Sequence, residues 1–218
     1  MARRREEWVT KVIVCYGDSN TWGADPTGVG RFPPDVRWTG VLQHELGAGY
    51  KVIEEGLNGR TTNIDDTIEE DRNGRAQLPP IIESHRPFDL MIIMLGTNDL
   101  KARNNRSAAD IAQSASKLAE IAKRSQAGPN DENPRVLLMA PPATIESGGG
   151  LDLLFAGSVE KSRLFPEQFA FYANAVGVDF FDAGSVIVSS QVDGIHIDPE
   201  EHSKLGHAVA AEVRRIVG

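Results

Sequence analysis

The sequence is poor in cysteine, and it has no apolar run long enough to cross a membrane. The one cysteine in 218 residues, Cys15, excludes an internal disulfide and fits a reducing compartment, so we expect a cytoplasmic protein. Cys15 lies within an apolar run and is predicted to be a buried thiol rather than a nucleophile. The apolar run Leu90–Leu95 is far too short for a bilayer, so no membrane partner is expected.

Positive charge is also scarce, with 23 Lys and Arg against 31 Asp and Glu. The net charge of −8 favours solubility and argues against a nucleic-acid partner. The basic run Arg3–Arg5 stands beside two glutamates and is interpreted as a solvated terminus rather than a polyanion site. It does not resemble the start of a signal peptide, because the apolar stretch Val12–Tyr16 is short and leads directly into a turn.

No Gly-x-Gly-x-x-Gly or Walker loop follows any predicted strand, which disfavours a nucleotide-binding module. No internal repeat, low-complexity tract or linker divides the chain. With 40% hydrophobic and 25% charged residues the composition is globular, and the length is enough to bury a full core. We therefore expect a single domain over residues 1–218.

Short apolar runs alternate with amphipathic stretches, which is the pattern of an α/β fold with a parallel sheet covered by helices. The run Leu90–Leu95 is apolar on both faces and is predicted to be the central strand. The five predicted strands cover residues 11–16, 50–54, 90–95, 136–140 and 179–181. The predicted helices begin after the caps Asp35, Ser107 and Asp198, with one more over 166–176.

Three polar turns follow strand ends directly and contain Ser19, Gly59 and Asn98. In a doubly wound sheet the ligand site lies at the carboxyl ends of the strands. The pattern therefore places these three residues at one edge of the sheet.

A serine in such a turn is by itself more typical of a helix cap than of a nucleophile. Ser19 needs a base, because its hydroxyl is a poor nucleophile alone. His196 follows Asp193 by three residues, a spacing that lets the carboxylate contact the imidazole and stabilise its protonated form. The other four histidines lack an acid at this spacing before a turn, so His196 is the predicted base.

An oxyanion also needs hydrogen-bond donors, and three are available. The backbone N–H of Ser19 is one, and Gly59 has no side chain to keep its own N–H from a substrate. The Asn98 amide is the third. Taken alone, Asn58–Gly59 would be an ordinary turn and Asn98–Asp99 a helix cap.

These segments together resemble the sequence blocks of the SGNH (GDSL-type) hydrolases, in the same order across nearly the whole chain. The stretches Asp35–Gly40, Arg60–Asn63 and Phe181–Val186 are similar to the bacterial arylesterase/acyltransferase branch. The resemblance implies a flavodoxin-like three-layer α/β/α sandwich that uses no metal or organic cofactor. It implies the triad Ser19, Asp193 and His196, with an oxyanion hole of Ser19, Gly59 and Asn98.

One departure from the family pattern is Asn20, where a leucine usually follows the serine. Asn20 is expected to line the substrate pocket with Trp22, Leu154 and Phe155. The segment 143–165 contains three consecutive glycines and then apolar side chains, so it is predicted to cover the site as a long loop. Its apolar residues would also suit an interface in a homo-oligomer.

The predicted activity is therefore hydrolysis of short-chain acyl esters, with acyl transfer to alcohols as a further activity. A carbohydrate or antibiotic deacetylase with the same triad is the main alternative. Thioesterase or lysophospholipase activity is disfavoured, because no long apolar stretch indicates a tunnel for an acyl chain. A catalytically silent interaction protein is the last alternative, and the intact set of catalytic residue types argues against it.

Overall fold

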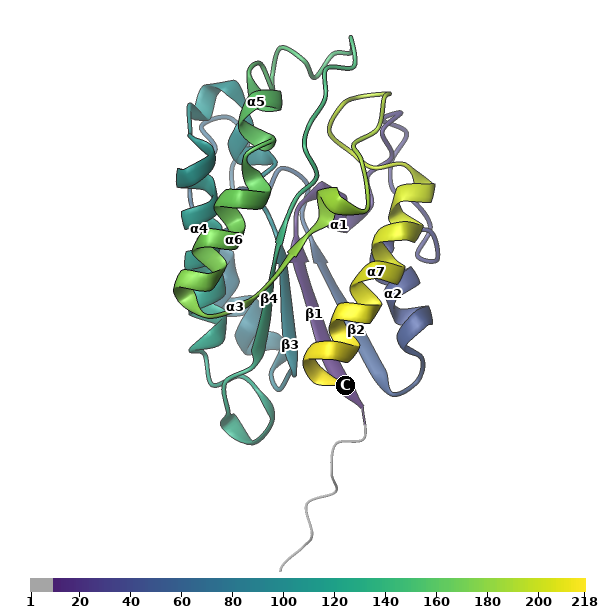
Figure 1. Ribbon diagram of the computed structural model, residues 1–218, viewed down its shortest axis with the longest axis vertical. Coiled ribbons are helices and arrows are strands. Elements are labelled where there is room, and N and C mark those ends of the chain that lie inside the picture. The colour runs from purple at the N-terminus through teal and green to yellow at the C-terminus, as the bar shows by residue number, and fades with distance from the viewer. Residues whose placement is uncertain (1–9) are drawn as a thin grey trace, which may run out of the picture.

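The computed structural model describes residues 10–218, so the basic run Arg3–Arg5 lies outside the described residues. The fold is a three-layer α/β/α sandwich around one parallel sheet with the strand order β2-β1-β3-β4-β5 (Figure 1). The strands are β1 (Lys11–Gly17), β2 (Tyr50–Gly56), β3 (Leu90–Met94), β4 (Arg135–Ala140) and β5 (Asp179–Asp182). The predicted five-stranded parallel sheet is confirmed, and β3 is its central strand as expected.

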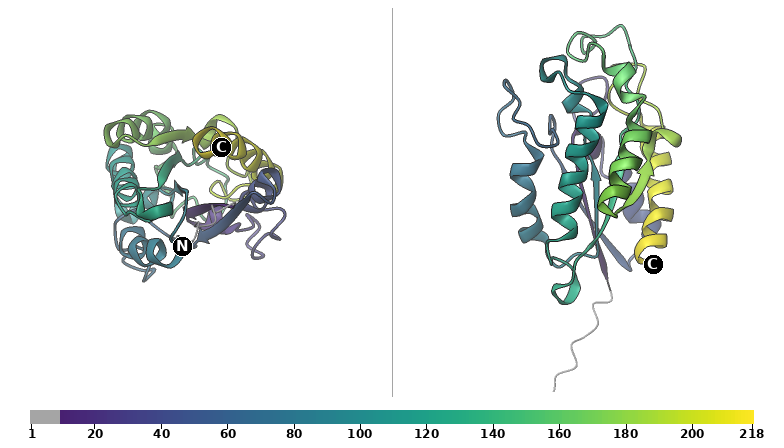
Figure 2. Two further views of the ribbon diagram at one scale, coloured as in Figure 1. Left: turned by 90° about the horizontal axis from the view of Figure 1, so that it is seen from below. Right: turned by 60° about the vertical axis from the view of Figure 1, so that its left-hand side comes forward.

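Two groups of helices cover the two faces of the sheet (Figures 1 and 2). Helices α2 and α7 pack on one face, and α3, α4 and α6 pack on the other. The helices are α1 (Ser19–Trp22), α2 (Trp38–Leu46), α3 (Gly74–His85), α4 (Ala108–Lys123), α5 (Ser158–Ser162), α6 (Phe165–Val176) and α7 (Pro199–Val217). No helix in the described part of the chain is both long and apolar enough to span a bilayer.

Alternation along the strands divides the core into two halves. In β1, Ile13 and Cys15 face α2 and α7, whereas Val14 and Tyr16 face the opposite helical layer. All five residues of β3 are buried, which is why its sequence is apolar without alternation. Cys15 is fully buried, as predicted, and this burial raises the pKa of its thiol well above the usual value.

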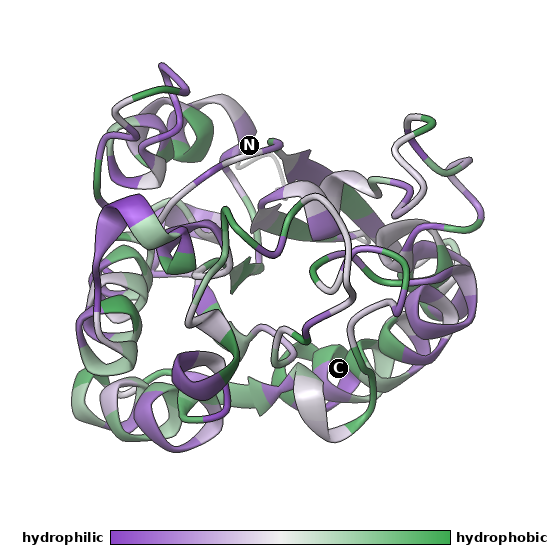
Figure 3. Ribbon diagram, turned by 90° about the horizontal axis from the view of Figure 1, so that it is seen from above, coloured by the Kyte–Doolittle hydropathy of each residue, from purple (hydrophilic) through white to green (hydrophobic). Residues whose placement is uncertain are grey.

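All five strands run in one direction, so their carboxyl ends meet at the upper edge in Figure 1. Figure 3 looks onto this edge and shows the connecting loops arranged around it. Because the strands are parallel, the turn after β1, the loop after β2 and the loop after β3 all leave the sheet at this edge. The segments that contain Ser19, Gly59 and Asn98 therefore meet at this edge of the sheet.

Some helix boundaries differ from the expectation. Arg37, not Asp35, is the N-cap of α2, and its side chain makes no capping hydrogen bond. Ser107 does cap α4, in a capping box with Asp110. The sequence pattern did not predict α3, because Pro79 and Pro80 lie inside it. The segment 143–165 is not loop throughout, since it contains α5.

Candidate active site

Ser19 is presented by a sharp turn from β1 into the short helix α1. A Cβ at Gly17 would lie 2.0 Å from Thr21 Oγ1, and a Cβ at Gly56 would lie 2.2 Å from the Trp22 nitrogen. These two glycines therefore let α1 pack directly on the ends of β1 and β2. Ser19 takes the first position of α1 and is 7% exposed, so its hydroxyl is reachable while its backbone is fixed.

The preceding residue, Asp18, holds the turn. Its Oδ1 accepts a hydrogen bond of 3.0 Å from the Asn20 N–H and so caps α1. Asp18 is 1% exposed, and burial raises the pKa of its carboxyl to about 6 even though the capping bond opposes the shift. Asp18 therefore stabilises the turn that carries Ser19.

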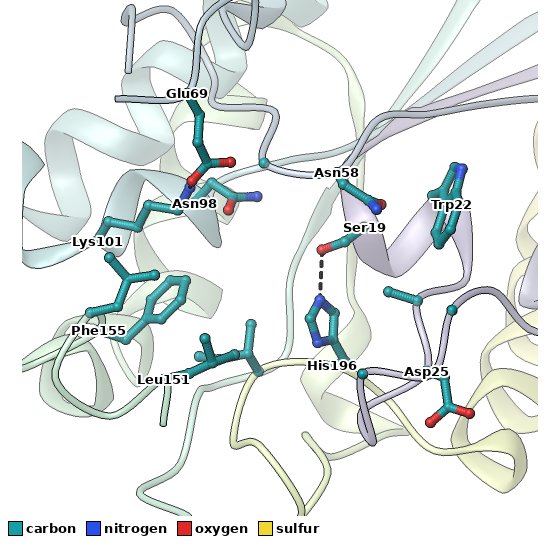
Figure 4. A pocket seen from close by; sticks show the side chains of 16 residues that line it. Ser19, Trp22, Asp25, Asn58, Glu69, Asn98, Lys101, Leu151, Phe155 and His196 are labelled. Carbon is teal, nitrogen blue, oxygen red and sulfur yellow. Dashed lines mark hydrogen bonds and ion pairs between the residues drawn. The ribbon is translucent and has the colours of Figure 1, made fainter. Parts of the chain in front are cut away.

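His196 and Asp193 complete a chain of hydrogen bonds that begins at Ser19. His196 Nε2 lies 2.9 Å from Ser19 Oγ, and His196 Nδ1 lies 2.5 Å from Asp193 Oδ2 (Figure 4 shows the first of these). In the tautomer that carries its hydrogen on Nδ1, this N–H donates a hydrogen bond to the Asp193 carboxylate. Nε2 then has no hydrogen and accepts a hydrogen bond from the Ser19 hydroxyl. The three residues stand in the geometry of a nucleophile, a base and an orienting acid.

Asp193 is held by its own loop as well as by the imidazole. Its Oδ1 accepts from the backbone N–H groups of Ile195 and His196, both at 2.9 Å. Burial alone would raise the pKa of Asp193, but the hydrogen bonds from His196 and the two N–H groups outweigh it and lower the pKa. The carboxylate therefore stays ionised where it faces the imidazole.

A glycine allows this loop to close tightly. Gly194 has a φ of +78°, and a Cβ there would lie 2.1 Å from the Ile145 carbonyl oxygen. Gly194 and Ile145 are also joined by a backbone hydrogen bond of 3.0 Å. The loop after β4 is thereby fastened to the loop that carries His196.

Asn98 and Gly59 line the same pocket as His196. Asn98 Nδ2 donates to the Arg60 carbonyl at 3.2 Å, and Figure 4 shows its amide turned toward Ser19. This bond uses one of the two amide hydrogens and leaves the other for a ligand. Gly59 has a φ of +79°, and no acceptor within residues 10–218 takes its N–H. Both groups are therefore free to donate into the pocket.

Asp99 fastens the Asn98 loop to the Gly59 loop. Its carboxylate accepts from the Thr62 N–H at 2.9 Å and from the Thr62 hydroxyl at 2.5 Å, and it pairs with Arg106 at 3.2 Å. Burial raises the pKa of Asp99 to about 6, against the opposing effect of these contacts. The relative position of the two loops thus depends on a fully buried carboxyl.

Arg60 is a positioning group that sequence reasoning did not single out. Its Nη1 donates to the Gly17 carbonyl at 2.7 Å and its Nε to Gln77 at 3.0 Å, while its guanidinium lies 4.2 Å from the Tyr16 ring centre. Arg60 is 3% exposed. Its side chain holds the end of β1 just before Ser19, and its carbonyl holds Asn98. The signals in the sequence were its place directly after the Asn58–Gly59 turn and the resemblance of the stretch Arg60–Asn63 to the arylesterase branch.

The pocket that contains these groups has a volume of about 350 Å³. Its residues form an apolar wall on one side and a charged wall on another (Figure 4). The lining residues are Ser19, Trp22, Ala24, Asp25, Gly28, Gly30, Asn58, Gly59, Glu69, Asn98, Lys101, Leu151, Leu154, Phe155, Ile195 and His196. The structure thus places the predicted pocket residues Trp22, Leu154 and Phe155 in the lining.

The placement of Asn20 in the pocket was wrong. Its Nδ2 donates to the Ile195 carbonyl at 3.2 Å, and the residue is 2% exposed. The side chain is therefore turned away from the pocket and joins the serine turn to the histidine loop.

The charged wall belongs to a cluster that the sequence did not reveal. Lys101 Nζ pairs with Asp66 at 3.3 Å and with Glu69 at 2.5 Å. Arg103 pairs with the same two carboxylates at 2.6 and 3.0 Å. Burial of Asp66 would raise its pKa, but the contacts with Arg103, the backbone and Lys101 lower it strongly. The cluster joins the loop after β2 to the loop after β3.

The other four histidines lie within the described residues and do not line this pocket. His202 is fully buried in α7, where its Nδ1 accepts from the Trp38 N–H at 3.2 Å. His44 is exposed, and His85 pairs with Glu55 at 2.6 Å. Within residues 10–218, no three His, Cys, Asp or Glu side chains cluster so as to hold a metal ion.

Comparison with known proteins identifies the family of the chain. Residues 15–203 match the model of the GDSL-like lipase/acylhydrolase family. A search of curated proteins found no match. The native M. smegmatis aryl esterase is 43% identical over 95% of this chain and 100% of its own, with a TM-score of 0.90. Est24, a carbohydrate acetylesterase from Sinorhizobium meliloti, is 38% identical over 94% of this chain and 99% of its own, with a TM-score of 0.90.

A more distant structure agrees in fold alone. The member of the lipolytic protein G-D-S-L family from Veillonella parvula is 16% identical over 95% of this chain and 98% of its own, with a TM-score of 0.65. The family match begins before Ser19 and ends after His196, so it includes every segment on which the predicted resemblance rested. That resemblance is confirmed, and the chain belongs to the GDSL-like lipase/acylhydrolase family of carboxylic ester hydrolases.

Proposed function

We propose that this chain hydrolyses short-chain acyl esters through an acyl-enzyme on Ser19, with His196 and Asp193 completing the triad. The observation that carries the proposal is the unbroken contact chain of 2.9 Å and 2.5 Å from Ser19 through His196 to Asp193. A serine hydroxyl needs such a base, and the base needs a fixed tautomer.

In the proposed mechanism, Ser19 Oγ attacks the ester carbonyl as His196 Nε2 takes the hydroxyl proton. Asp193 stabilises the imidazolium, and the carbonyl oxygen becomes an oxyanion. It accepts from the backbone N–H groups of Ser19 and Gly59 and from the Asn98 amide. His196 then returns the proton to the departing alcohol, and a water activated by the same imidazole releases the acid from Ser19.

The pocket supports short acyl groups. Its volume of about 350 Å³ is at the lower end for ligand pockets. One wall is built from Leu151, Leu154, Phe155 and Ile195, which suits a small apolar group. The relatives include an aryl esterase and a carbohydrate acetylesterase, so O-deacetylation of a carbohydrate is the alternative activity.

We further propose acyl transfer to alcohols and assembly of the chain into a homo-oligomer. Both rest on the segment that bears the apolar wall. Phe155 folds inward and is 6% exposed, whereas Leu153 is 88% exposed on the same segment. A partner subunit that covers Leu153 would narrow the mouth of the pocket and exclude water, which would let an alcohol compete for the acyl-enzyme.

We also propose that the protein acts in a reducing compartment such as the cytoplasm. The single buried cysteine supports this proposal.

The test is an ester panel with 4-nitrophenyl acetate as reference, run with and without an added alcohol. Ser19→Ala should lower the rate by at least about three orders of magnitude, and an organophosphonate should label Ser19. Ser84→Ala, which removes an exposed serine hydroxyl from α3, is the matched control and should keep full activity. An active Ser19→Ala enzyme, or labelling at another residue, would overturn the assignment.

A further inference from the structure

The charged wall of the pocket presents a carboxylate that the proposed mechanism does not use. Glu69 Oε1 accepts from Lys101 at 2.5 Å and from Arg103 at 3.0 Å. No donor within residues 10–218 pairs with Oε2. Figure 4 shows the Glu69 side chain reaching into the pocket beside Asn98. One oxygen of this carboxylate is therefore fixed by the protein, and the other is free to accept.

The accessible charge on this wall is negative. The Glu69 side chain is 38% exposed, whereas that of Lys101 is 3% exposed. The Lys101 ammonium pairs with both Glu69 and the buried Asp66, so these two carboxylates occupy its donors. A molecule in the pocket therefore meets the carboxylate of the pair rather than the cation.

The carboxylate lies next to Gly59, a proposed oxyanion donor. Glu69 Oε2 is 2.4 Å from the point where a Cβ on Gly59 would stand, so it packs directly against the backbone of a proposed oxyanion donor. Lys101 and Arg103 offset its charge, which keeps it from opposing the oxyanion. A substituent of a bound ester that passes Gly59 comes within reach of this oxygen.

Resting on the proposed function, we infer that Glu69 determines specificity by accepting a hydrogen bond from a substrate hydroxyl. The apolar wall carries the short carbon chain, and the carboxylate selects esters that bear a hydroxyl group. An apolar substituent that covers the carboxylate displaces its hydrating water and offers no hydrogen bond in return, which makes binding of that substituent unfavourable. A carboxylate substituent has no hydrogen to donate to Glu69 Oε2 and places a second acceptor against it. Short hydroxylated esters, a class that includes monoacetylated polyols and sugars, are the substrates that fit.

The first experiment measures kcat/KM of the wild-type enzyme on two matched ester pairs. Butyl acetate and 3-hydroxypropyl acetate differ only by methyl against hydroxyl on the alcohol side. Methyl butanoate and methyl 3-hydroxypropanoate differ in the same way on the acyl side. In one pair the hydroxylated ester should be preferred about tenfold, the factor expected for a partly hydrated hydrogen bond to a charged acceptor. The absence of a preference in both pairs would overturn the inference.

The second experiment changes the charge and keeps the shape. Glu69→Gln should reduce the tenfold preference to less than about threefold, and it should raise kcat/KM for the carboxylate analogue of the same ester. Glu70→Gln makes the same charge change at the neighbouring exposed residue and should leave both ratios unchanged. A purely structural role for Glu69 would lower the rates on all esters together and leave the ratios intact, which contradicts the inference.

The outcomes separate this inference from the proposed function. Wild-type activity on 4-nitrophenyl acetate without any hydroxyl preference rejects the role of Glu69 and leaves the serine mechanism standing. Ester hydrolysis that survives Ser19→Ala rejects the proposed mechanism instead. If Glu69→Gln does not fold, the wild-type pairs still decide, and Glu69→Asp, which shortens the carboxylate by one methylene, should reduce the preference while keeping the charge.

Discussion

Acid should destabilise this protein by protonating His202, a residue of α7 that is not part of the proposed triad. His202 is fully buried, and its Nδ1 accepts from the Trp38 N–H at 3.2 Å. Its Nε2 is buried without a partner within the described residues. Burial, followed by the positive charges of His196 and Arg37, lowers the pKa of His202 from 6.5 to about 4. The folded state therefore keeps this imidazole neutral.

The sign and size of the effect follow from that shift. A lowered histidine pKa stabilises the fold fully above the unfolded value, and this stability is lost as the pH falls through the folded value. With pKa values of 6.5 unfolded and about 4 folded, the loss relative to pH 7 is about 2 kcal/mol at pH 5 and about 3 kcal/mol at pH 4. Asp18 and Asp99 oppose this trend, because their raised pKa values favour the fold at low pH.

The variant His202→Gln separates the effect of His202 titration on stability from the effects of Asp18 and Asp99. His202→Gln can keep an acceptor for the Trp38 N–H but does not titrate. At pH 7 it should cost about 1–2 kcal/mol through imperfect packing. The difference in unfolding free energy between wild type and variant should then shrink and change sign as the pH falls from 6.5 to 4. Urea titrations at half-unit pH steps measure it, with His44→Gln, at a side chain 89% exposed, as the control.

Parallel stability curves for wild type and His202→Gln across pH 4 to 7 would refute this reasoning. They would mean that His202 titrates alike in the folded and unfolded states, and therefore that its burial does not keep the imidazole neutral. A His44→Gln curve that also departs from wild type would instead assign the effect to histidines at the surface.

Two further predictions concern the site itself. Asn98→Ala should lower kcat by about 10²–10³ with little change in KM, because its amide acts on the developing charge; a change confined to KM in steady-state kinetics would make Asn98 a binding group. Burial raises the Asp18 pKa to about 6, so its stabilising contribution is present below pH 4 and lost as the pH rises through 6. Asp18→Asn should therefore gain about 2 kcal/mol relative to wild type between pH 4 and 8 in urea titrations, and a constant difference would contradict this.

The order of the strands along the chain and the edge that carries the site could be inferred from the sequence. The apolar runs are short, and a parallel sheet places all strand ends on one side. Ser19, Gly59 and Asn98 follow strand ends directly, so their meeting at one edge follows from the fold class alone. His196 could be selected because its acid partner lies three residues away, within one turn.

Helix α3 shows where the local pattern was insufficient. Pro79 and Pro80 lie inside it and weaken any prediction of a helix from the sequence. Leu78 and Ile82 are nevertheless buried in the core on this face of the sheet. Tertiary packing of these side chains therefore outweighs the propensity of the segment.

The sequence by itself determined the fold class, the chemical residue types and the edge at which they meet, because these depend on periodicity and on contacts within a turn. The tertiary structure alone decided which way the side chains around the nucleophile point. Asn20 donates to a carbonyl 175 positions away, and Glu69 pairs with a lysine 32 positions away. Such directions are set by partners that arrive from distant segments, so no local pattern could assign Asn20 to the loop junction or Glu69 to the pocket wall.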